Sequence, residues 1–314
     1  MSFSFSTFLA PGGAPTFSGH ETFALRSNWL KKAYDLLCAR PDLFSGDTAF
    51  VQLGVGKNMA QSIRFWGRVC GVFARADNGE GVAITPLGHA LLDDDGWDAF
   101  LVSPASHWLL HWQIAARPEA AFSFFYSFNL LKGGEFTLAQ LGGQIQAFIA
   151  NHGFRVPSDA TINRDLACMI DCYCRPDAQR LATAAEDLLL CPLLDLGLIQ
   201  RLPGQQVFRL VSGSQSTLPD ALIAFAVAQM MRRSGRETIA FSDLAYAPFS
   251  PGRVFRLDED ALLSRLHFLR DVTEGRAYYS DQAGIRSVAW PGVQDASFDM
   301  LLLTRVFADE VAHG

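Results

Sequence analysis

The sequence predicts a mainly helical α+β protein with small β-hairpins. We expect tandem winged-helix-like modules joined by an aromatic-rich helical segment. Residues 54–88 have the pattern of an amphipathic helix, a tight turn at Asn78-Gly79, a returning strand and the start of another helix. Residues 136–210 and 218–290 repeat an order of helices followed by two short strands. We therefore divide the chain into modules at 1–130, 131–215 and 216–314, the first of which includes the aromatic segment.

Length and composition set the class of protein. A chain of 314 residues exceeds one ordinary core, and 49% hydrophobic with 18% charged residues is typical of a folded protein. No apolar run has the length of a membrane span, and the first residues lack the pattern of a signal peptide. We therefore expect a cytoplasmic protein with no membrane partner.

The charge is unevenly distributed along the chain. The net charge is −6, yet residues 1–75 contain eight Lys and Arg against four Asp and Glu, which leaves −10 for the remainder. A basic module on an acidic body favours local contact with DNA.

The first predicted helix runs from Glu21 to Ala39. Ser18 or Thr22 would cap it, and Glu21 would lie at its positive end. Its basic side chains are candidates for DNA contact: Arg26, Lys31 and Lys32. A short helix is predicted next, from Asp47 to Leu53.

The helix that follows Gly56 is the predicted DNA-reading helix. At about 100° per residue, its polar side chains fall on one narrow face, and these are Lys57, Gln61, Arg64 and Arg68. The opposite face is apolar and consists of Met59, Ile63, Trp66, Cys70 and Phe73. Long cationic side chains around a glutamine can reach phosphates and base edges together. The alternative is a surface helix whose charges are simply solvated.

The glycine-rich start of this helix invites comparison with a phosphate loop. Gly54 and Gly56 precede Lys57, but Val51 stands where a phosphate loop has its first glycine, and Asn58 replaces the magnesium-binding Ser or Thr. Nucleotide hydrolysis is therefore not expected. Lys57, Asn58 and the backbone amides are instead predicted to hold a DNA phosphate.

Residues 93–128 are too aromatic for a surface and are predicted to pack the modules together. His107 and His111 have the i, i+4 spacing of metal ligands, but hydrogen-bonded histidines in a packed aromatic helix are favoured. The acidic run from Asp93 to Asp95, with Asp98, could collect magnesium, although a solvated loop is the more common role for such a cluster.

The second module is predicted to contain a helix around Leu138–Phe148 and a helix over Ala160–Tyr173 capped by Ser158. The spacing of Cys168, Cys172, Cys174 and Cys191 matches neither a zinc ribbon nor a ferredoxin, so buried reduced thiols are favoured over a metal site. The third module is predicted to begin with an apolar helix at Leu218–Met231 and to end in strands near 277–279 and 288–290.

Six motifs resemble the SspB family of bacterial DNA phosphorothioation systems. They are GHETFALRSNWLKKAYDLL, LGVGKNMAQSIRFW, ITPLG, DGWDAFL, HWLLHW and EDLLLCPLLDLGLI, in this order between residue 17 and about residue 200. The resemblance implies a protein that binds double-stranded DNA and nicks one strand, so that sulfur replaces a non-bridging phosphate oxygen in phage defence. It also implies that the protein acts together with a cysteine desulfurase, an ATPase and an ATP-pyrophosphatase-like sulfur-transfer protein. A homodimer is a further possible assembly.

The resemblance transfers no firm catalytic motif. His20, Glu21 and Asp98 are the catalytic candidates because they lie within the matching motifs, and a divalent metal such as Mg²⁺ is the only cofactor that nicking would call for. The sequence does not identify the residues that would bind such a metal. The alternative functions are a non-catalytic DNA-binding adaptor and a winged-helix transcription regulator.

Overall fold

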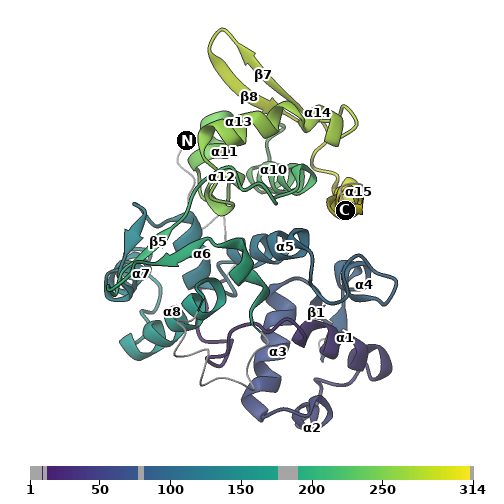
Figure 1. Cartoon of the computed structure of the whole chain (residues 1–314), viewed down its shortest axis with the longest axis vertical. Coiled ribbons are helices and arrows are strands. Elements are labelled where there is room, and N and C mark those ends of the chain that lie inside the picture. Colours follow the sequence, from purple (N-terminus) through teal and green to yellow (C-terminus); the bar gives the residue numbers. More distant parts are fainter. Residues whose placement is uncertain (1–8, 10–12, 77–80, 176–189, 312–314) are drawn as a thin grey trace. The chain divides into compact units, whose positions relative to one another are not determined.

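The computed structural model describes residue 9 and residues 13–76, 81–175 and 190–311. It divides into two compact units (Figure 1). We call one the α3 unit, formed by Ala14–Phe124 and Gly133–Leu210, and the other the α10 unit, formed chiefly by Phe125–Lys132 and the chain from Val211 onward. The mainly helical α+β class with small antiparallel sheets is confirmed. The finer division into three modules stays a prediction.

The α3 unit begins with three helices and a hairpin, in the predicted order. These are α1 (Trp29–Ala39), α2 (Ala49–Leu53), α3 (Lys57–Val69), β1 (Phe73–Arg75) and β2 (Val82–Ile84), followed by α4 (Pro86–Leu92). The two strands are antiparallel, with Ala74 opposite Ala83. The Asn78-Gly79 turn lies outside the described residues.

The predicted start of the first helix is wrong. Helix α1 begins at Trp29, not at Glu21, and its preceding residue Asn28 makes no side-chain cap. Glu21 and Thr22 have φ values of 49° and 69°, which a right-handed helix does not allow. Neither Thr22 nor Ser18 therefore caps a helix, and Glu21 is not a helix-start acid.

The aromatic segment forms α5 (Pro104–Ala115) and α6 (Phe122–Asn129). Ser103 caps α5 by accepting the N–H of Ala105, and Pro104 fits the first turn because that position needs no N–H donor. Every residue of α5 from Ala105 to Ala115 is buried. The helix is thus the centre of the α3 unit, in line with the prediction that this segment is too aromatic for a surface.

The rest of the α3 unit is a strand, two helices and a hairpin. In order these are β3 (Glu135–Phe136), α7 (Leu138–Asn151), α8 (Asp159–Tyr173), the 3-10 helix η2 (Pro192–Leu196), β4 (Ile199–Arg201) and β5 (Phe208–Leu210). Ser158 caps α8 as predicted, and Thr137 and Gln140 form a capping box on α7. The strands form an antiparallel sheet in the order β3-β5-β4, so the first strand pairs with the last.

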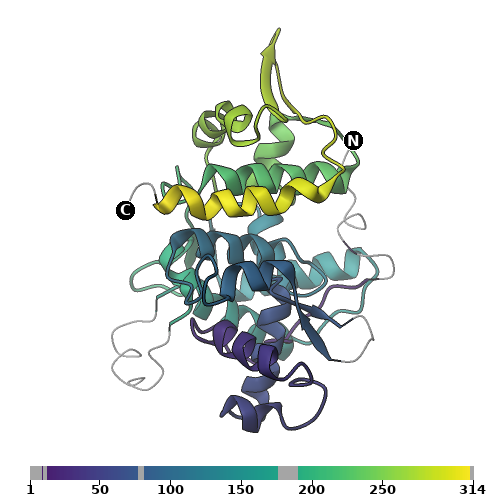
Figure 2. The same ribbon diagram turned by 90° about the vertical axis from the view of Figure 1, so that its right-hand side faces the viewer.

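The α10 unit repeats this connectivity. Its elements are α10 (Asp220–Ser234), β6 (Thr238–Ala240), α11 (Phe241–Tyr246), α12 (Pro251–Val254), α13 (Glu259–His267), α14 (Leu269–Val272), β7 (Tyr278–Gln282), β8 (Ile285–Ala289), η3 (Ala296–Phe298) and α15 (Asp299–Val311). The sheet order is β6-β8-β7. Helix α15 runs alongside α10, as Figure 2 shows, and Arg232 of α10 forms an ion pair with Asp299 at 2.5 Å.

A short segment from the middle of the chain belongs to the α10 unit. Asn129 Oδ1 accepts the backbone N–H of Phe249 at 2.6 Å. Arg253 donates to the carbonyl oxygens of Asn129 and Leu131, each at 2.9 Å. Among the described residues, no helix is both long and apolar enough to span a membrane.

Candidate nucleic-acid interface

The predicted two-sided character of α3 is present in the structure. Lys57, Gln61 and Arg68 are exposed and Arg64 is half-buried, whereas Ile63 and Trp66 on the opposite side are fully buried. Lys57 lies 3.7 Å from Asp47, but both side chains are well exposed, so this ion pair adds little stability. Asn58 is exposed at the start of the helix. The polar face of α3 is therefore open to a ligand.

Trp66 anchors the helix from its apolar side. Its indole N–H donates to the carbonyl oxygen of Phe23 at 3.0 Å. Its ring stacks on His20, with centroids 6.3 Å apart, and meets Phe124 edge to face at 5.8 Å. These contacts fix the rotation of α3, and so the direction in which its basic side chains point.

Arg117 holds the C-terminal end of α3. Its guanidinium donates to the carbonyl oxygen of Arg68 at 3.3 Å and to Gln113 Oε1 at 3.0 Å. A cation at the C-terminal end of a helix also interacts favourably with the helix dipole, whose negative end lies there. Gly71 has a φ of 76°, and a Cβ there would lie 3.0 Å from the Arg117 guanidinium, so glycine fits this close approach. Burial lowers the pKa of Arg117 from its ordinary value.

A cleft of about 760 Å³ opens beside α3, and we call it the arginine cleft. Among the described residues that line it, six are charged. Four are arginines, Arg64, Arg68, Arg75 and Arg117, and two are carboxylates, Glu21 and Glu119. All six come from the α3 unit. The positive charge of the α3 face thus continues into a concave surface.

Arg64 lies between this cleft and a smaller hollow of about 120 Å³ on the α2 side of the helix. Lys57 and Asp47 line that smaller hollow as well. The Nε atom of Arg64 is buried, and it has no hydrogen-bond partner among the described residues. Burial and the neighbouring charge of Arg68 lower the pKa of Arg64. Arg64 is therefore a half-buried cation with a donor still to be satisfied.

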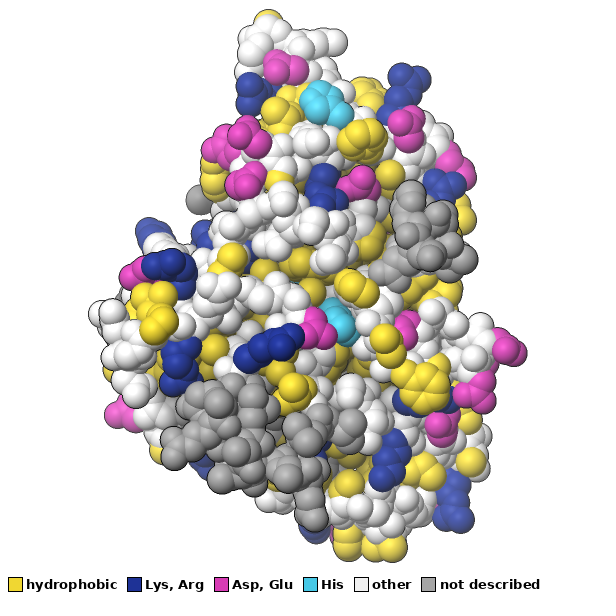
Figure 3. Space-filling model, viewed as in Figure 1, with side chains coloured by type: hydrophobic (Ala, Val, Ile, Leu, Met, Phe, Trp, Pro, Cys, Tyr) yellow, Lys and Arg dark blue, Asp and Glu magenta, His cyan; other side chains and the backbone are white. Residues whose placement is uncertain are grey.

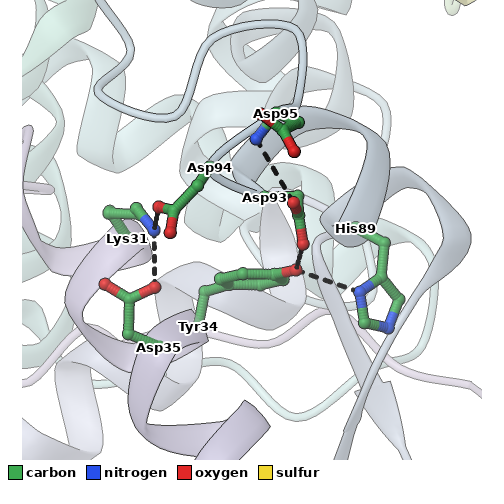
Figure 4. A network of polar contacts seen from close by, with 7 residues as sticks. All are labelled: Lys31, Tyr34, Asp35, His89, Asp93, Asp94 and Asp95. Atoms are coloured by element: carbon green, nitrogen blue, oxygen red, sulfur yellow. Dashed lines mark hydrogen bonds and ion pairs between the residues drawn. The ribbon is translucent and has the colours of Figure 1, made fainter.

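The basic residues predicted on the first helix are placed differently from one another. Lys31 is buried and forms ion pairs with Asp35 at 2.5 Å and Asp94 at 2.6 Å (Figure 4). Burial disfavours its charge, but the hydrogen bonds to both carboxylates raise its pKa. Lys32 is exposed, and the half-buried Arg26 holds its guanidinium 5.3 Å from the ring of Trp29. The charge of Lys31 is thus matched by two carboxylates of the same unit, whereas that of Lys32 faces solvent.

His20 forms a buried pair with a residue that sequence reasoning missed. Its Nε2 lies 2.8 Å from Oδ1 of Asp165 on α8, and both side chains are almost fully buried. His20 Nδ1 accepts the N–H of Thr22 at 3.1 Å, so the proton of the neutral ring is on Nε2 and is donated to Asp165. Asp165 Oδ1 also accepts the N–H of Ser18 at 2.6 Å. The pair ties residues 18–22 to α8.

Glu21 and Asp98, the other catalytic candidates, have different surroundings. Glu21 is half-buried and lines the arginine cleft. Asp98 accepts the N–H groups of Val102 and Ser103 at 3.0 and 2.8 Å, and the hydroxyl of Ser106 at 2.6 Å. These contacts hold the loop before α5 against the first turn of that helix. The structure therefore brings Glu21, but not Asp98, to the cleft beside α3.

Asp93, His107 and His111, weighed above as metal ligands, make internal hydrogen bonds. Asp93 accepts the hydroxyl of Tyr34 at 2.8 Å, in the network of Figure 4. His107 Nε2 lies 2.8 Å from the carbonyl oxygen of Leu101, and His111 Nδ1 lies 2.7 Å from the hydroxyl of Tyr173. Hydrogen-bonded histidines in a packed helix, the favoured interpretation, are confirmed.

The four cysteines weighed as metal ligands form no disulfide and are buried in the α3 unit: Cys168, Cys172, Cys174 and Cys191. Burial raises the pKa of Cys168 and Cys191, so these two thiols stay protonated. Burial also disfavours the charged form of Cys172, but hydrogen bonds with Cys168 and Cys191 lower the pKa of Cys172. Across the described ranges, no three His, Cys, Asp or Glu side chains are grouped in a way that could hold a metal ion.

Sequence reasoning missed Asp165, Arg117 and Glu119. Asp165 carried a signal, because it is a carboxylate on the same side of α8 as the buried Ile162 and Leu166. Such a residue needs an internal partner. Arg117 and Glu119 lie in the loop after α5, and no local pattern connects them with α3.

Comparison with known proteins supports the sequence resemblance. A family model described as a protein of unknown function, DUF4007, matches residues 17–306. An SspB crystal structure has 32% sequence identity and a TM-score of 0.82, and the alignment covers 98% of this chain and 90% of that chain. A magnesium ion-bound SspB crystal structure has 29% identity and a TM-score of 0.80, with 99% and 100% covered. No curated protein matches the chain.

Proposed function

We propose that this chain, which belongs to the SspB family, is the DNA-binding component of a bacterial DNA phosphorothioation system and nicks one strand. The observation that carries the proposal is the exposed basic face of α3, anchored by Trp66 and continued into the arginine cleft. Phosphate contacts from Lys57, Gln61, Arg64 and Arg68 would place α3 against a duplex. In this role the chain would work with the sulfur-transfer, ATPase and cysteine desulfurase proteins of the system.

The winged-helix interpretation gains support from connectivity. The second half of the α3 unit and the α10 unit both have a strand, helices and a hairpin, with the first strand paired to the last. In such a module the helix before the hairpin is the one that enters the major groove. For residues 29–84 that helix is α3.

Charge favours α3 over α13, the longer of the two helices that precede the hairpin of the α10 unit. Helix α13 begins with Glu259 and Asp260, after its capping residue Asp258, and all three are exposed. Figure 3 shows acidic side chains gathered over this helix. A phosphate backbone would be repelled there, so we assign DNA contact to the α3 unit.

A magnesium-bound relative raises the question of a metal in this chain. Mg²⁺ takes oxygen ligands and is often held by one or two carboxylates together with substrate phosphates. Within the described residues no group of three ligands is present, and the carboxylates of Asp93, Asp94 and Asp98 already have internal partners. Asp93, Asp94 and Asp98 therefore do not form a built metal site, and no step of nicking is assigned to a metal.

Two assays test the proposal in sequence. Fluorescence anisotropy of a labelled duplex across a salt series measures DNA binding. Conversion of supercoiled plasmid to the open-circular form, with and without divalent metal, measures nicking. Binding with nicking supports the whole proposal, whereas binding without nicking under any metal supports the non-catalytic adaptor. Absence of DNA binding overturns both.

A further inference from the structure

The arginine cleft has a composition that an open phosphate-binding surface does not need. Two carboxylates, Glu21 and Glu119, face the same space as its four arginines. A surface selected only for a polyanion would exclude carboxylates, because each one repels phosphate. Their presence indicates a ligand with hydrogen-bond donors as well as negative charge.

The wall of the cleft also offers an aromatic surface. Phe65 of α3 is half-buried and lines it. The ring of Phe65 meets Trp66 and His20 edge to face, with centroids 5.1 and 5.9 Å away. The ring also lies so close to Gly19 that a Cβ there would be 2.5 Å from it. Phe65 is therefore held in place, as a stacking partner for a planar ligand should be.

We infer that the arginine cleft binds a single nucleotide, with its phosphate at the arginines, its base against Phe65 and its donor groups toward Glu21 and Glu119. The cleft volume of about 760 Å³ lies within the usual range of small-molecule sites. Four guanidinium groups and two carboxylates leave a charge of +2, which suits one phosphate-bearing unit. The inference rests on the proposed function, since the basic face of α3 would deliver the DNA.

Such a nucleotide has two sources with the same chemistry. One is a nucleotide turned out of the bound strand, and the other is a free mononucleotide. A base outside the stack exposes its hydrogen-bonding edge and its π-face. In the arginine cleft the carboxylates would accept hydrogen bonds from the edge, and Phe65 would stack on the face.

The test compares the affinity of the full chain for three labelled duplexes: a fully paired duplex, the same duplex with one unpaired central nucleotide, and one whose unpaired position lacks a base. The abasic form keeps the flexibility of the bulge but removes the base. We expect the unpaired nucleotide to improve affinity by about tenfold over the paired duplex, and the abasic form to lose most of that gain. Each of the four deoxynucleoside monophosphates is also titrated alone, with intrinsic fluorescence as the readout.

Matched variants assign the effect to the cleft. Arg75→Gln and Glu119→Gln change side chains of the cleft that lie outside α3, and they should abolish the preference for the unpaired nucleotide. Lys57→Gln, on the outer face of α3, should weaken all three duplexes equally and keep the preference. Arg40 is exposed in the same unit but lines neither the arginine cleft nor the smaller hollow. Arg40→Gln should therefore leave the affinity for all three duplexes unchanged. A thermal melt of each variant verifies folding.

Each outcome decides the inference separately from the proposed function. A bulge preference lost in the cleft variants supports an everted nucleotide. Binding of free mononucleotides that is lost in the same variants supports the second source. Equal affinity for the three duplexes, with no mononucleotide bound, overturns the inference while the DNA-binding proposal stands. If no duplex binds, the proposed function fails, and the mononucleotide titration alone decides the cleft.

Discussion

The imidazole of His20 and the carboxylate of Asp165 form a buried hydrogen bond of 2.8 Å between positions 145 residues apart. The same carboxylate oxygen accepts the N–H of Ser18, so one atom of α8 holds the turn that passes beneath Trp66. This relationship explains why residues 18–22 form turns, with positive φ at Ser18, Glu21 and Thr22, and not the first turn of a helix.

Removal of the Asp165 carboxylate should destabilise the α3 unit. Asp165→Ala leaves the buried His20 Nε2–H and Ser18 N–H without their acceptor, which should cost roughly 2 to 5 kcal/mol. Asp165→Asn should cost less, because the amide oxygen can still accept both hydrogen bonds. Chemical denaturation of the two variants measures the difference. If Asp165→Asn unfolds like the parent yet no longer nicks plasmid, the pair acts in catalysis and not only in folding.

Arg64→Ala and Arg68→Ala should each weaken DNA binding without unfolding the protein, because the packing of α3 comes from its opposite face. Loss of one phosphate contact lowers the slope of log K against log salt by about 0.9. Anisotropy across a salt series measures this slope, and Arg40→Ala provides the charge-matched control. Unchanged affinity in both variants would remove α3 from the interface.

Trp66→Ala should cost roughly 3 to 5 kcal/mol, since Trp66 is fully buried and the change leaves a large cavity. Trp66→Phe keeps most of the apolar contact but deprives the Phe23 carbonyl of its donor, so a smaller loss of about 1 to 2 kcal/mol is expected. DNA binding should decline in step with the folded fraction. A thermal melt of Trp66→Ala that matched the parent would contradict the packing described for this helix.

Asp98→Asn should lower stability by about 1 to 3 kcal/mol. Asp98 accepts from Val102 at Oδ1 and from Ser103 and Ser106 at Oδ2, so in either orientation the amide nitrogen of the introduced asparagine would face at least one donor. The unfolding midpoint and the nicking rate should be compared in the same preparation. Lost nicking at an unchanged midpoint would show that Asp98 acts on the substrate.

Glu21→Gln tests the one catalytic candidate that lies at the cleft. On the nicking proposal, plasmid conversion should fall at least about tenfold while duplex affinity stays nearly constant, because the change removes charge and keeps shape. A chelator should stop the reaction of the parent if it depends on a divalent metal. Nicking by Glu21→Gln at the parental rate would leave Glu21 without a role in the reaction.

The parts of the fold that depend on local pattern could be predicted from the sequence. The two faces of α3 follow from helical periodicity, and the cap of α8 follows from Ser158 before an apolar run. The histidines of α5 could be interpreted correctly because aromatic residues surround them.

The predictions that failed or fell short depend on distant residues. The helix expected from Glu21 is prevented by contacts with Asp165 on α8. The charge of Lys31 is matched by Asp94, which lies 63 positions away. The arginine cleft joins α3 and β1 to the loop after α5, and no periodicity in the sequence connects these segments.

The hydrogen bonds from Arg253 to Asn129 and Leu131 also bear on how the protein is made. Residues 125–132 leave the ribosome well before their partners beyond Val211, and the whole of 133–210 is synthesised in between. This segment must therefore wait for its partners in the α10 unit while residues 133–210 of the α3 unit are synthesised. A protein fragment that starts at Val211 would lack residues 125–132, which belong to the α10 unit. The two units are consequently interleaved in sequence, and recombination at a single point could not exchange one without damaging the other.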